Sequence, residues 1–458
     1  MTFNSWLFPL FFLIFYPVYL AVKNTRLASL WLVIASYAFY GWFNPLYVLL
    51  IAYATVVDYM VVALMEKTGR KKLCLAVSIA SNIGLLSFFK YGKFVAENLN
   101  LLFTHLGLSW QVPMPGILFP VGISFFTFRS LTYTIDCYRG GVQRERNILR
   151  YAAFVSLFPM LVCGPIERAC NLLPQMREKI RITGQDVADG ASLFVVGLFK
   201  KLALADYLAL YVNKVYEAPD QFGAPALVLA TFAFAWQIYF DFSGYTDMAR
   251  GVARLLGFRL MLNFNNPYLA DGLGDFWRRW HISLSSWFRD YVYIPLGGNR
   301  KGTVRTYVNL FVTFVVSGIW HGAAWTYALW GVVHAAGNIA TREFERSAVY
   351  REKVPRFLKQ MLVFVVVCFA WIFFRANTVG DAWLIVRRIF IAGWSDPLFP
   401  LLMPALVLIV WAYQFLYESR ARRLVEFAPA RVCVVVGMVL YMIVFASSNV
   451  QPFIYQQF

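Results

Sequence analysis

His321 lies within SGIWHGAAW (residues 317–325), a stretch that is otherwise apolar and aromatic. An imidazole is costly to place at bilayer depth, so an ionisable residue there is by default a functional hypothesis. Since its ordinary pKa is near 6.5, a neutral imidazole can take a proton from an attacking hydroxyl group. The same ring can instead attack an acyl group and carry it briefly. His321 is therefore a candidate catalytic residue, either as a general base or as a transient acyl carrier.

The composition indicates a membrane protein that crosses the bilayer many times. Of 458 residues, 60% are hydrophobic and 14% are charged, whereas soluble domains are about half apolar and a quarter charged. No polar linker divides the chain, so we predict one membrane-embedded domain over residues 1–458. The net charge of +18 comes from short basic loops rather than a continuous stripe. We expect these loops to contact anionic lipid headgroups, and no nucleic acid.

The basic loops also predict the orientation. Three basic loops alternate with loops poor in positive charge: KNTR, EKTGRKK and YRGGVQRER. The basic loops should therefore face the cytoplasm. The first apolar run has no basic residue before it and no small-residue cleavage site, so we predict a retained first span with the N-terminus outward. Residues 151–164 are apolar but too short to cross and should be re-entrant or interfacial. About eleven or twelve crossings are expected, near residues 7–22, 28–42, 46–64, 73–89, 114–136, 190–212, 224–241, 306–320, 322–340, 360–377, 399–418 and 432–448.

Loop charge places His321 at a turn. The loop 341–359 carries six Lys or Arg against three Glu, and NRKGTVR before residue 306 is also basic. Both ends of 306–340 should therefore be cytoplasmic, and the chain must reverse between them. We predict the reversal at Ser317, Gly318 and Gly322, after a first arm of about 22 Å, shorter than a ~30 Å bilayer core. Irregular backbone at that depth must line a cavity or be buried in protein.

His281 lies in a second aromatic stretch, DFWRRWHISLSSWFRDYVYIPLGGNRKG (275–302). This stretch predicts an amphipathic helix at the cytoplasmic interface, and anchoring explains it as well as function does. Upstream, Asp247 and Arg250 are spaced to form an ion pair on one helix face. Asp241 has no obvious local partner, and lining a cavity and structural capping are equal alternatives. The remaining two histidines, His105 in an outer loop and His334 on the second arm, are expected to be structural.

Metal chemistry is not indicated. Six scattered cysteines form no CxxC pair, and four histidines show no ligand spacing, so we predict no metal site and buried, inert cysteines. No Gly-rich phosphate loop is present either. We therefore expect no tightly bound cofactor.

Two histidine motifs together resemble the membrane-bound O-acyltransferase (MBOAT) family. The two motifs that carry the resemblance are FWRRWHISLSSWFRDYVYIPLGG and SGIWHGAAWTYALWG. They resemble the branch of the alginate O-acetyltransferases and, more distantly, that of the teichoic acid D-alanyltransferases. FPVGISFFTFRSLTYTIDCYRG, FPMLVCGPIERA, YFDFSGYTDMARG and the terminal PFIYQQF support it. The resemblance implies an all-α ring of membrane helices around a central tunnel, with N-terminal spans over 1–110 and a catalytic core over 111–458. It also implies that His321 is catalytic and that His281 is its paired catalytic partner.

The resemblance further implies acyl transfer from a cytoplasmic thioester to a hydroxyl at the outer face. The donor would be acetyl-CoA or an acyl carrier protein, and Asp241, Trp320, Arg278 and Arg279 are candidate tunnel or donor-side residues. Arg278 and Arg279 serve equally well as topology markers. We also predict that the protein lies in the bacterial inner membrane, and that it works with an outer-face partner protein and a polysaccharide acceptor. The alternatives are D-alanyl transfer from a carrier protein to teichoic acid, acylation with a long-chain donor, and a transporter or channel.

Overall fold

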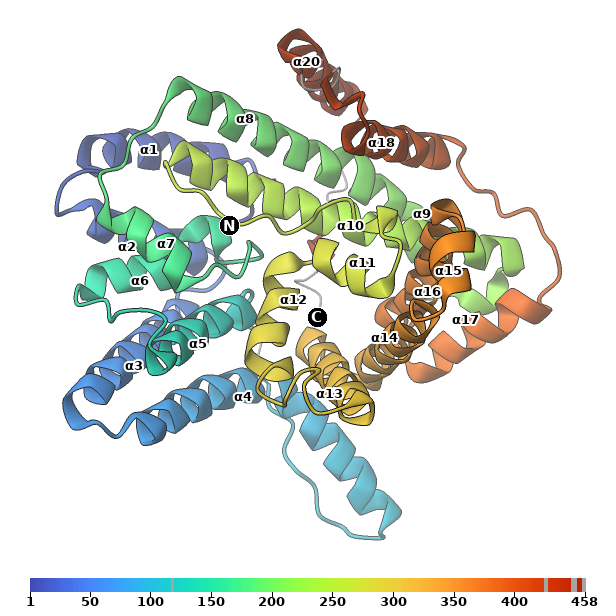
Figure 1. Cartoon of the computed structure of the whole chain (residues 1–458), viewed down its shortest axis with the longest axis horizontal. Helices are drawn as coiled ribbons and strands as arrows, with labels where there is room; N and C mark the ends of the chain where they lie inside the picture. Colours follow the sequence, from blue (N-terminus) through green and yellow to red (C-terminus); the bar gives the residue numbers. More distant parts are fainter. Residues whose placement is uncertain (117–118, 424–426, 446–450, 455–458) are drawn as a thin grey trace. The chain divides into compact units, whose positions relative to one another are not determined.

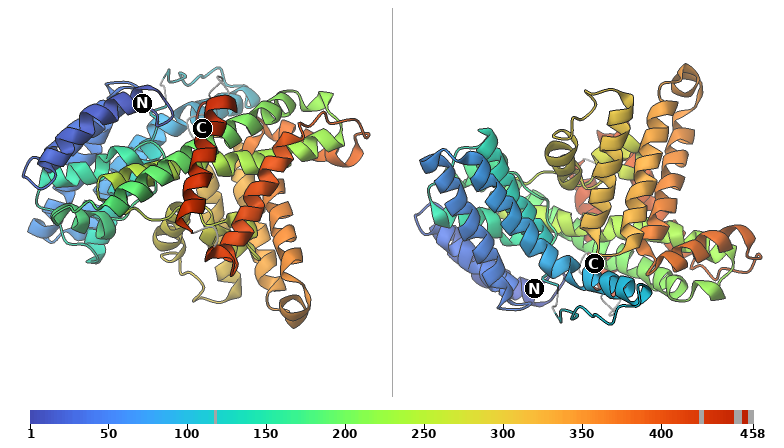
Figure 2. Two further views of the ribbon diagram at one scale, coloured as in Figure 1. Left: turned by 90° about the horizontal axis from the view of Figure 1, so that it is seen from above. Right: turned by 90° about the horizontal axis from the view of Figure 1, so that it is seen from below.

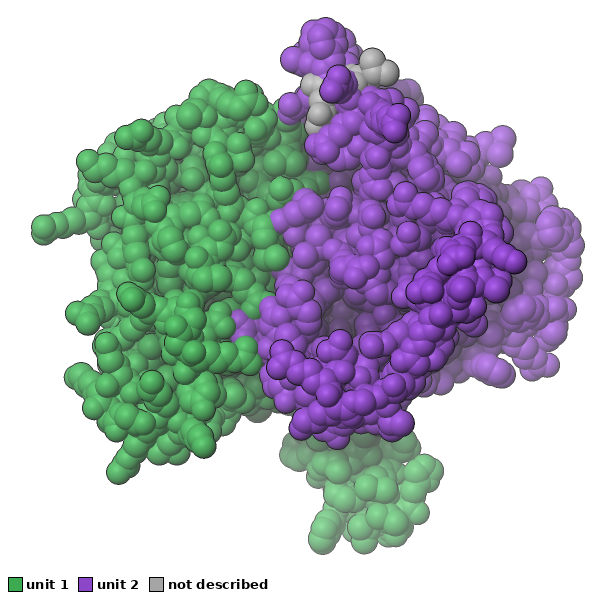
Figure 3. Space-filling model, in the orientation of Figure 1, with its two compact units in different colours: residues 1–194, 246–261 green, residues 195–245, 262–458 purple. Residues whose placement is uncertain are grey.

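The structure, a computed structural model, describes residues 1–116, 119–423, 427–445 and 451–454 (Figure 1). Within these residues all regular elements are helices, as the predicted all-α class requires. The contacts divide the chain into two compact units, which Figure 3 colours separately: unit 1 (residues 1–194 and 246–261) and unit 2 (residues 195–245 and 262–458). One domain over the whole chain stays a prediction. The end of the predicted 432–448 span and the last residues of PFIYQQF, 455–458, lie outside the described residues.

Unit 1 differs from prediction in the length of its helices. α4 runs through 35 residues, so His105 is the exposed last residue of a helix and not part of a loop. Within the span predicted over 114–136, helix α5 begins at Ile123. Unit 1 holds α1 (Leu7–Val22), α2 (Ala28–Gly41), α3 (Tyr47–Thr68), α4 (Lys71–His105), α5 (Ile123–Arg139), α6 (Ile148–Ser156), η1 (Phe158–Met160), α7 (Ala169–Arg177) and most of α8 (Gly184–Phe199).

The short apolar segment after α5 is confirmed as too short to cross. α6 ends at Ser156 and the chain continues as η1, and this irregular region is buried within unit 1. The fully buried Arg129 on α5 donates to the carbonyl oxygens of Val155 (2.6 Å) and Met160 (2.9 Å). These bonds satisfy backbone groups that no helix pairs, which is the condition for irregular backbone away from water.

Unit 2 contains all of the predicted site residues. Its 275–302 stretch is not the single amphipathic helix that we predicted, because the helix breaks at Trp280–His281. Unit 2 holds η2 (Lys200–Ala205), α9 (Asp206–Glu217), η3 (Pro219–Gln221), most of α10 (Ala224–Leu255), η4 (Pro267–Leu269), α11 (Leu273–Arg279), α12 (Ile282–Phe288), η5 (Arg289–Tyr293), α13 (Thr303–His321), α14 (Trp325–Phe344), α15 (Ala348–Lys353), α16 (Arg356–Arg375), α17 (Val379–Ile391), α18 (Leu402–Glu418) and α20 (Ala428–Phe445).

α13 and α14 form the predicted hairpin, and they pack side by side (Figure 2). The reversal lies later than predicted, because Ser317 and Gly318 remain helical and α13 ends only at His321. The first arm is therefore 19 residues, or about 28 Å, long. The glycines serve helix packing and not helix breaking: a Cβ on Gly318 would overlap the carbonyl oxygen of Tyr327, and one on Gly331 would lie 2.5 Å from that of Phe314.

Many helices are built to meet lipid. Among the described residues, five helices are long and apolar enough to cross a membrane: α3, α4, α10, α16 and α20. Shorter apolar helices occur at Leu7–Val22, Ala28–Gly41, Ile148–Met160 and Leu402–Glu418. α20 buries none of its residues, so its apolar side chains are left to a lipid environment. The number of eleven or twelve crossings stays a prediction.

Gly331→Ala should destabilise the protein, because the added methyl group would meet backbone atoms that cannot move aside. Overpacking of this kind costs about 1–3 kcal/mol. Thermal unfolding of the detergent-solubilised protein would show the loss. Gly84→Ala on α4 is the matched control, because a Cβ there meets nothing within 4 Å. Equal stability of the two variants would contradict the packing explanation.

Candidate active site

His281 lies at the break between α11 and α12 in a strained backbone conformation. Its φ of 42° is in the left-handed region, which costs an L-residue roughly 1–2 kcal/mol. Asn263 holds this turn, because its carbonyl oxygen accepts from the Ile282 N–H (2.9 Å) and its side-chain Oδ1 accepts from the Ser283 N–H (3.1 Å). Strained backbone that is held so firmly is often found at functional sites.

Asn263 also determines which nitrogen of His281 carries the proton. The Asn263 Oδ1 accepts from the backbone N–H and the hydroxyl of Ser283, at 3.1 and 2.9 Å, so this atom is the amide oxygen. His281 Nδ1 lies 3.1 Å from the same oxygen and must donate its hydrogen to it. The lone pair of the neutral ring is therefore on Nε2. Complete burial lowers the pKa of His281 to about 3, so the ring is neutral near pH 7.

His321 is buried at the C-terminal end of α13 among aromatic rings. Its ring meets Trp330, Phe374 and Trp320 edge-on, with centroids 5.0, 5.4 and 5.1 Å away. The chain leaves the helix at Gly322, where a Cβ would collide with the ring of Tyr327. The predicted turn thus fixes the imidazole inside protein.

Trp320 joins the two histidines. The ring of this buried residue lies 6.4 Å from that of His281 and 5.1 Å from that of His321. The structure therefore brings together three residues that the sequence separates by up to 40 positions.

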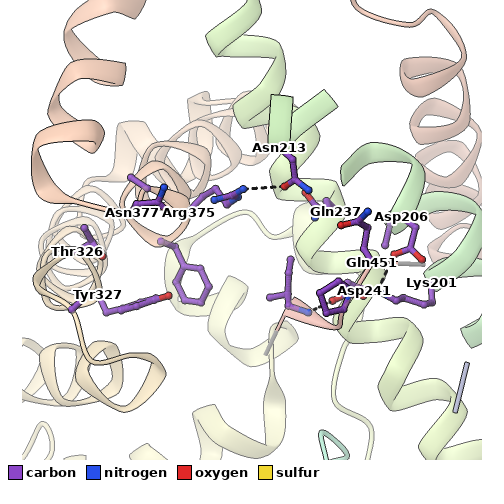
Figure 4. A pocket seen from close by; sticks show the side chains of 16 residues that line it. Lys201, Asp206, Asn213, Gln237, Asp241, Thr326, Tyr327, Arg375, Asn377 and Gln451 are labelled. Atoms are coloured by element: carbon purple, nitrogen blue, oxygen red, sulfur yellow. Dashed lines mark hydrogen bonds and ion pairs between the residues drawn. The ribbon is translucent and has the colours of Figure 1, made fainter. Parts of the chain in front are cut away.

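A cavity of about 290 Å³ lies in unit 2; His321 is not among the described residues that line it, but it contacts one of them. Tyr327 and Phe374 line it, and Phe374 also contacts the His321 ring (Figure 4). Asp241 lines the same cavity on the opposite side (Figure 4). Lining a cavity was one of the two alternatives predicted for this residue, and structural capping was the other. The other alternative also holds in part, because Asp241 accepts a hydrogen bond from the Ile454 N–H at 2.7 Å.

The partners of Asp241 were not predicted from the sequence. Lys201 Nζ lies 2.7 Å from Asp241 and 2.8 Å from Asp206, and all three side chains are buried. The signal was available, because Lys201 and Asp206 interrupt the apolar run LFKKLALADYLAL, where charges are rare unless they have a role. Asp247 and Arg250 form the ion pair that their spacing predicted, at 3.4 Å.

The two arginines before His281 have different surroundings. Arg279 is committed to ion pairs with Asp275 (2.8 Å) and Glu418 (2.7 Å). Arg278 is largely exposed and forms a long 3.5 Å pair with Asp275. Of the two, Arg278 has the exposure that a contact with a phosphorylated ligand needs.

Of the other two histidines, His334 shares the ring of Trp330 with His321, whereas His105 belongs to unit 1. His105 is exposed on α4, whereas His334 is fully buried and packs on Trp330 and Trp277, with ring centroids 4.7 and 4.9 Å apart. Among the described residues no group of three His, Cys, Asp or Glu could hold a metal ion.

The helical membrane architecture and the paired histidines point to one class of protein, the membrane-bound acyltransferases. Residues 105–380 match the membrane-bound O-acyltransferase (MBOAT) family, and the chain belongs to it. The resemblance drawn from the motifs is thereby confirmed, and the protein is a multi-pass membrane O-acyltransferase.

Similar proteins occur in several bacteria. A probable alginate O-acetylase of Pseudomonas aeruginosa is 39% identical over 400 residues, covering 86% of this chain and 75% of that protein. A peptidoglycan O-acetyltransferase of Helicobacter pylori is 34% identical, covering 84% and 79%. A teichoic acid D-alanyltransferase of Bacillus subtilis is more distant, with 27% identity over 56% of this chain and 69% of that protein.

The stability of the protein should depend on His281 below neutral pH. The unfolded ring takes up a proton near its ordinary pKa of about 6.5, whereas the folded pKa is about 3. Between these values the unfolded state binds more protons, so the free energy of unfolding falls as the pH is lowered, by up to ~1.4 kcal/mol per pH unit. Denaturant unfolding between pH 7.5 and 5 measures this slope.

His281→Asn should flatten that slope, because asparagine tolerates a left-handed backbone and can still donate toward Asn263, but does not titrate. His105→Asn at the exposed end of α4 is the control and should keep the wild-type slope. Identical slopes for His281→Asn and the wild type would show that the folded ring does titrate in this range.

Proposed function

We propose that the protein transfers an acetyl group from acetyl-CoA in the cytoplasm to a hydroxyl group at the outer face of the bacterial inner membrane. The destination is an extracellular or periplasmic polysaccharide, as the names of the alginate and peptidoglycan relatives suggest. One observation carries the proposal: His281 and His321 both contact Trp320 in the buried core of unit 2, beside a polar cavity. Two imidazoles so placed suit acyl transfer.

The topology supports separate sides for donor and acceptor. With the N-terminus outward and the loop 341–359 inward, the turn after His321 and the end of α16 face the outer side. Three residues that line the cavity belong to these outer segments: Ala324, Arg375 and Asn377. We therefore propose that the cavity binds the acceptor. Arg278 and the break at His281 fall on the cytoplasmic side, where the phosphates of the donor would meet an exposed guanidinium.

His321 acts as the general base. It takes the proton from the acceptor hydroxyl as the oxygen attacks the thioester carbon, and a tetrahedral oxyanion forms. The carbon–sulfur bond then breaks, and the leaving thiolate takes the proton from His321. The net result is an acetyl ester and a free thiol. A route in which His321 first carries the acetyl group itself gives the same products.

His281 positions the donor and does not polarise its carbonyl. Since Nδ1–H is given to Asn263, the Nε2 atom can only accept a hydrogen bond. The pantetheine arm of coenzyme A has amide N–H groups that such an acceptor can hold. Orienting the thioester in this way is worth several kcal/mol when the geometry is right.

The charge of the cavity favours a neutral hydroxyl as acceptor. Its lining has two cations, Lys201 and Arg375, and two carboxylates, Asp206 and Asp241. The cations are already engaged, since Lys201 pairs with both carboxylates and Arg375 donates to Asn213 Oδ1 at 2.9 Å. A polyanionic chain would find no net attraction there. We therefore propose that an outer-face partner protein takes the acetyl group on a hydroxyl and passes it to the polymer.

Transport is the alternative from another class. Paired intramembrane carboxylates would favour it, and Asp206 and Asp241 do meet across Lys201. Membership of an acyltransferase family nevertheless favours the enzyme.

His321→Ala should lower acetyl transfer by about 10²–10⁴-fold, because general acid–base catalysis contributes that much. Incorporation of radiolabel from acetyl-CoA by the purified protein in nanodiscs measures the effect. His105→Ala serves as the control, since that residue is exposed and far along the chain from the site. A folded His321→Ala protein with wild-type transfer would refute the assignment.

The donor can be tested directly. We expect radiolabel to move from acetyl-CoA, because the relatives with the higher identity are O-acetylating enzymes by name. D-alanine charged on a carrier protein should not be used. Preference for the charged carrier would move the protein to the function named for the teichoic acid relatives.

A further inference from the structure

The buried ion triplet of Lys201, Asp206 and Asp241 holds a second part of the chain, residues 451–454. Asp241 Oδ2 accepts from the Ile454 N–H at 2.7 Å. The backbone N–H of Gln451 interacts favourably with the carboxylate of Asp206. One of the two carboxylates that share Lys201 thus binds the backbone of residues 451–454 directly (Figure 4).

Three burial and charge facts show that this arrangement is built into unit 2. The side chains of Lys201, Asp206 and Asp241 are only 4%, 3% and 3% exposed. Burying such ions costs several kcal/mol each, which is offset only with good geometry and further hydrogen bonds. One lysine against two carboxylates leaves one net negative charge, and N–H donors from residues 451–454 help to stabilise it.

The helices are shaped to bring the triplet together. Gly244 on α10 allows close contact, because a Cβ there would lie 2.7 Å from the carbonyl oxygen of Gly197. Immediately after Gly197, the π-helical turn η2 carries Lys201, and Asp206 begins α9. Such π turns are frequent at functional sites.

Residues 451–454 in turn contact both parts of the candidate site. Gln451, Pro452 and Ile454 line the cavity beside His321. The buried Phe453 packs on Tyr245 and Phe242, with centroids 5.0 and 6.0 Å away. Phe242 contacts the ring of His281 at 4.6 Å.

We propose that Lys201, Asp206 and Asp241 are positioning residues that clamp residues 451–454 as one wall of the acceptor cavity. Residues 451–454 of the same chain then form this cavity wall, and the buried ion triplet holds them in place. This inference rests on the proposed function for the role of the cavity, but the clamp itself can be tested without activity.

The first experiment measures the clamp alone. Ile454→Cys retains the N–H that Asp241 accepts and places a small apolar thiol at a buried position. In a background with the exposed Cys170 and Cys433 changed to serine, this thiol should react slowly with a membrane-impermeant maleimide. Adding Asp241→Asn weakens a charge-assisted hydrogen bond and should raise the labelling rate about tenfold. Asp247→Asn, on the same helix, should leave it at the starting rate.

The second experiment connects the clamp to catalysis. Ile454→Pro removes the N–H donor without changing the triplet. With N-acetylserine amide as the hydroxyl acceptor, Asp241→Asn and Ile454→Pro should each raise the acceptor KM by more than they lower kcat. The double variant should be no worse than the single ones, because both remove the same bond.

The outcomes separate the two proposals. Unchanged labelling in Asp241→Asn, additive effects in the double variant, or an equal fall of kcat with no change in KM would each overturn the clamp. If the wild type transfers no acetyl group from acetyl-CoA but labelling still responds to Asp241→Asn, the clamp stands and the proposed function fails.

Discussion

The close backbone contact between α13 and α14 fixes the position of His321. Gly318 and Gly331 allow the two helices to approach until a single added carbon would overlap a carbonyl oxygen of the other arm. Small residues at a helix crossing are how membrane helices gain packing energy, since lipid gives little hydrophobic driving force. Because the helices are so close, the reversal after His321 is tight and directs the imidazole into the aromatic core. The site could not keep this geometry if the hairpin opened.

Several buried polar groups at the candidate site are held by partners from distant parts of the chain. Asn263 gives His281 one acceptor and so determines its tautomer, and Lys201 neutralises one of the two negative charges on Asp206 and Asp241. Away from water, unsatisfied groups cost several kcal/mol, so these contacts are conditions for folding as well as for chemistry. Preorganised donors and acceptors of this kind need no rearrangement when substrate arrives.

How much the sequence could predict depended on the range of the interactions involved. Apolar run lengths and loop charges predicted helical membrane segments and the hairpin at His321, because these signals are local. The break at His281 was not predicted, since it depends on Asn263, which is 18 positions away. The partners of Asp241 on η2 and α9 and in residues 451–454 were missed for the same reason. The continuation of α13 through Gly318 was not predicted, because glycine often ends a helix. Here Gly318 instead allows α13 to pack closely against α14.

The same ion triplet argues against the transport alternative. A carboxylate that binds and releases a transported cation must exchange its ligands, so it cannot also hold fixed structural partners. Asp241 and Asp206 are each bound to Lys201, and Asp241 also holds the Ile454 N–H. Releasing either carboxylate would leave Lys201 short of a counter-ion in a buried place, which is strongly unfavourable. A triplet so committed favours a rigid cavity, and rigidity is what acyl transfer between two positioned reactants requires.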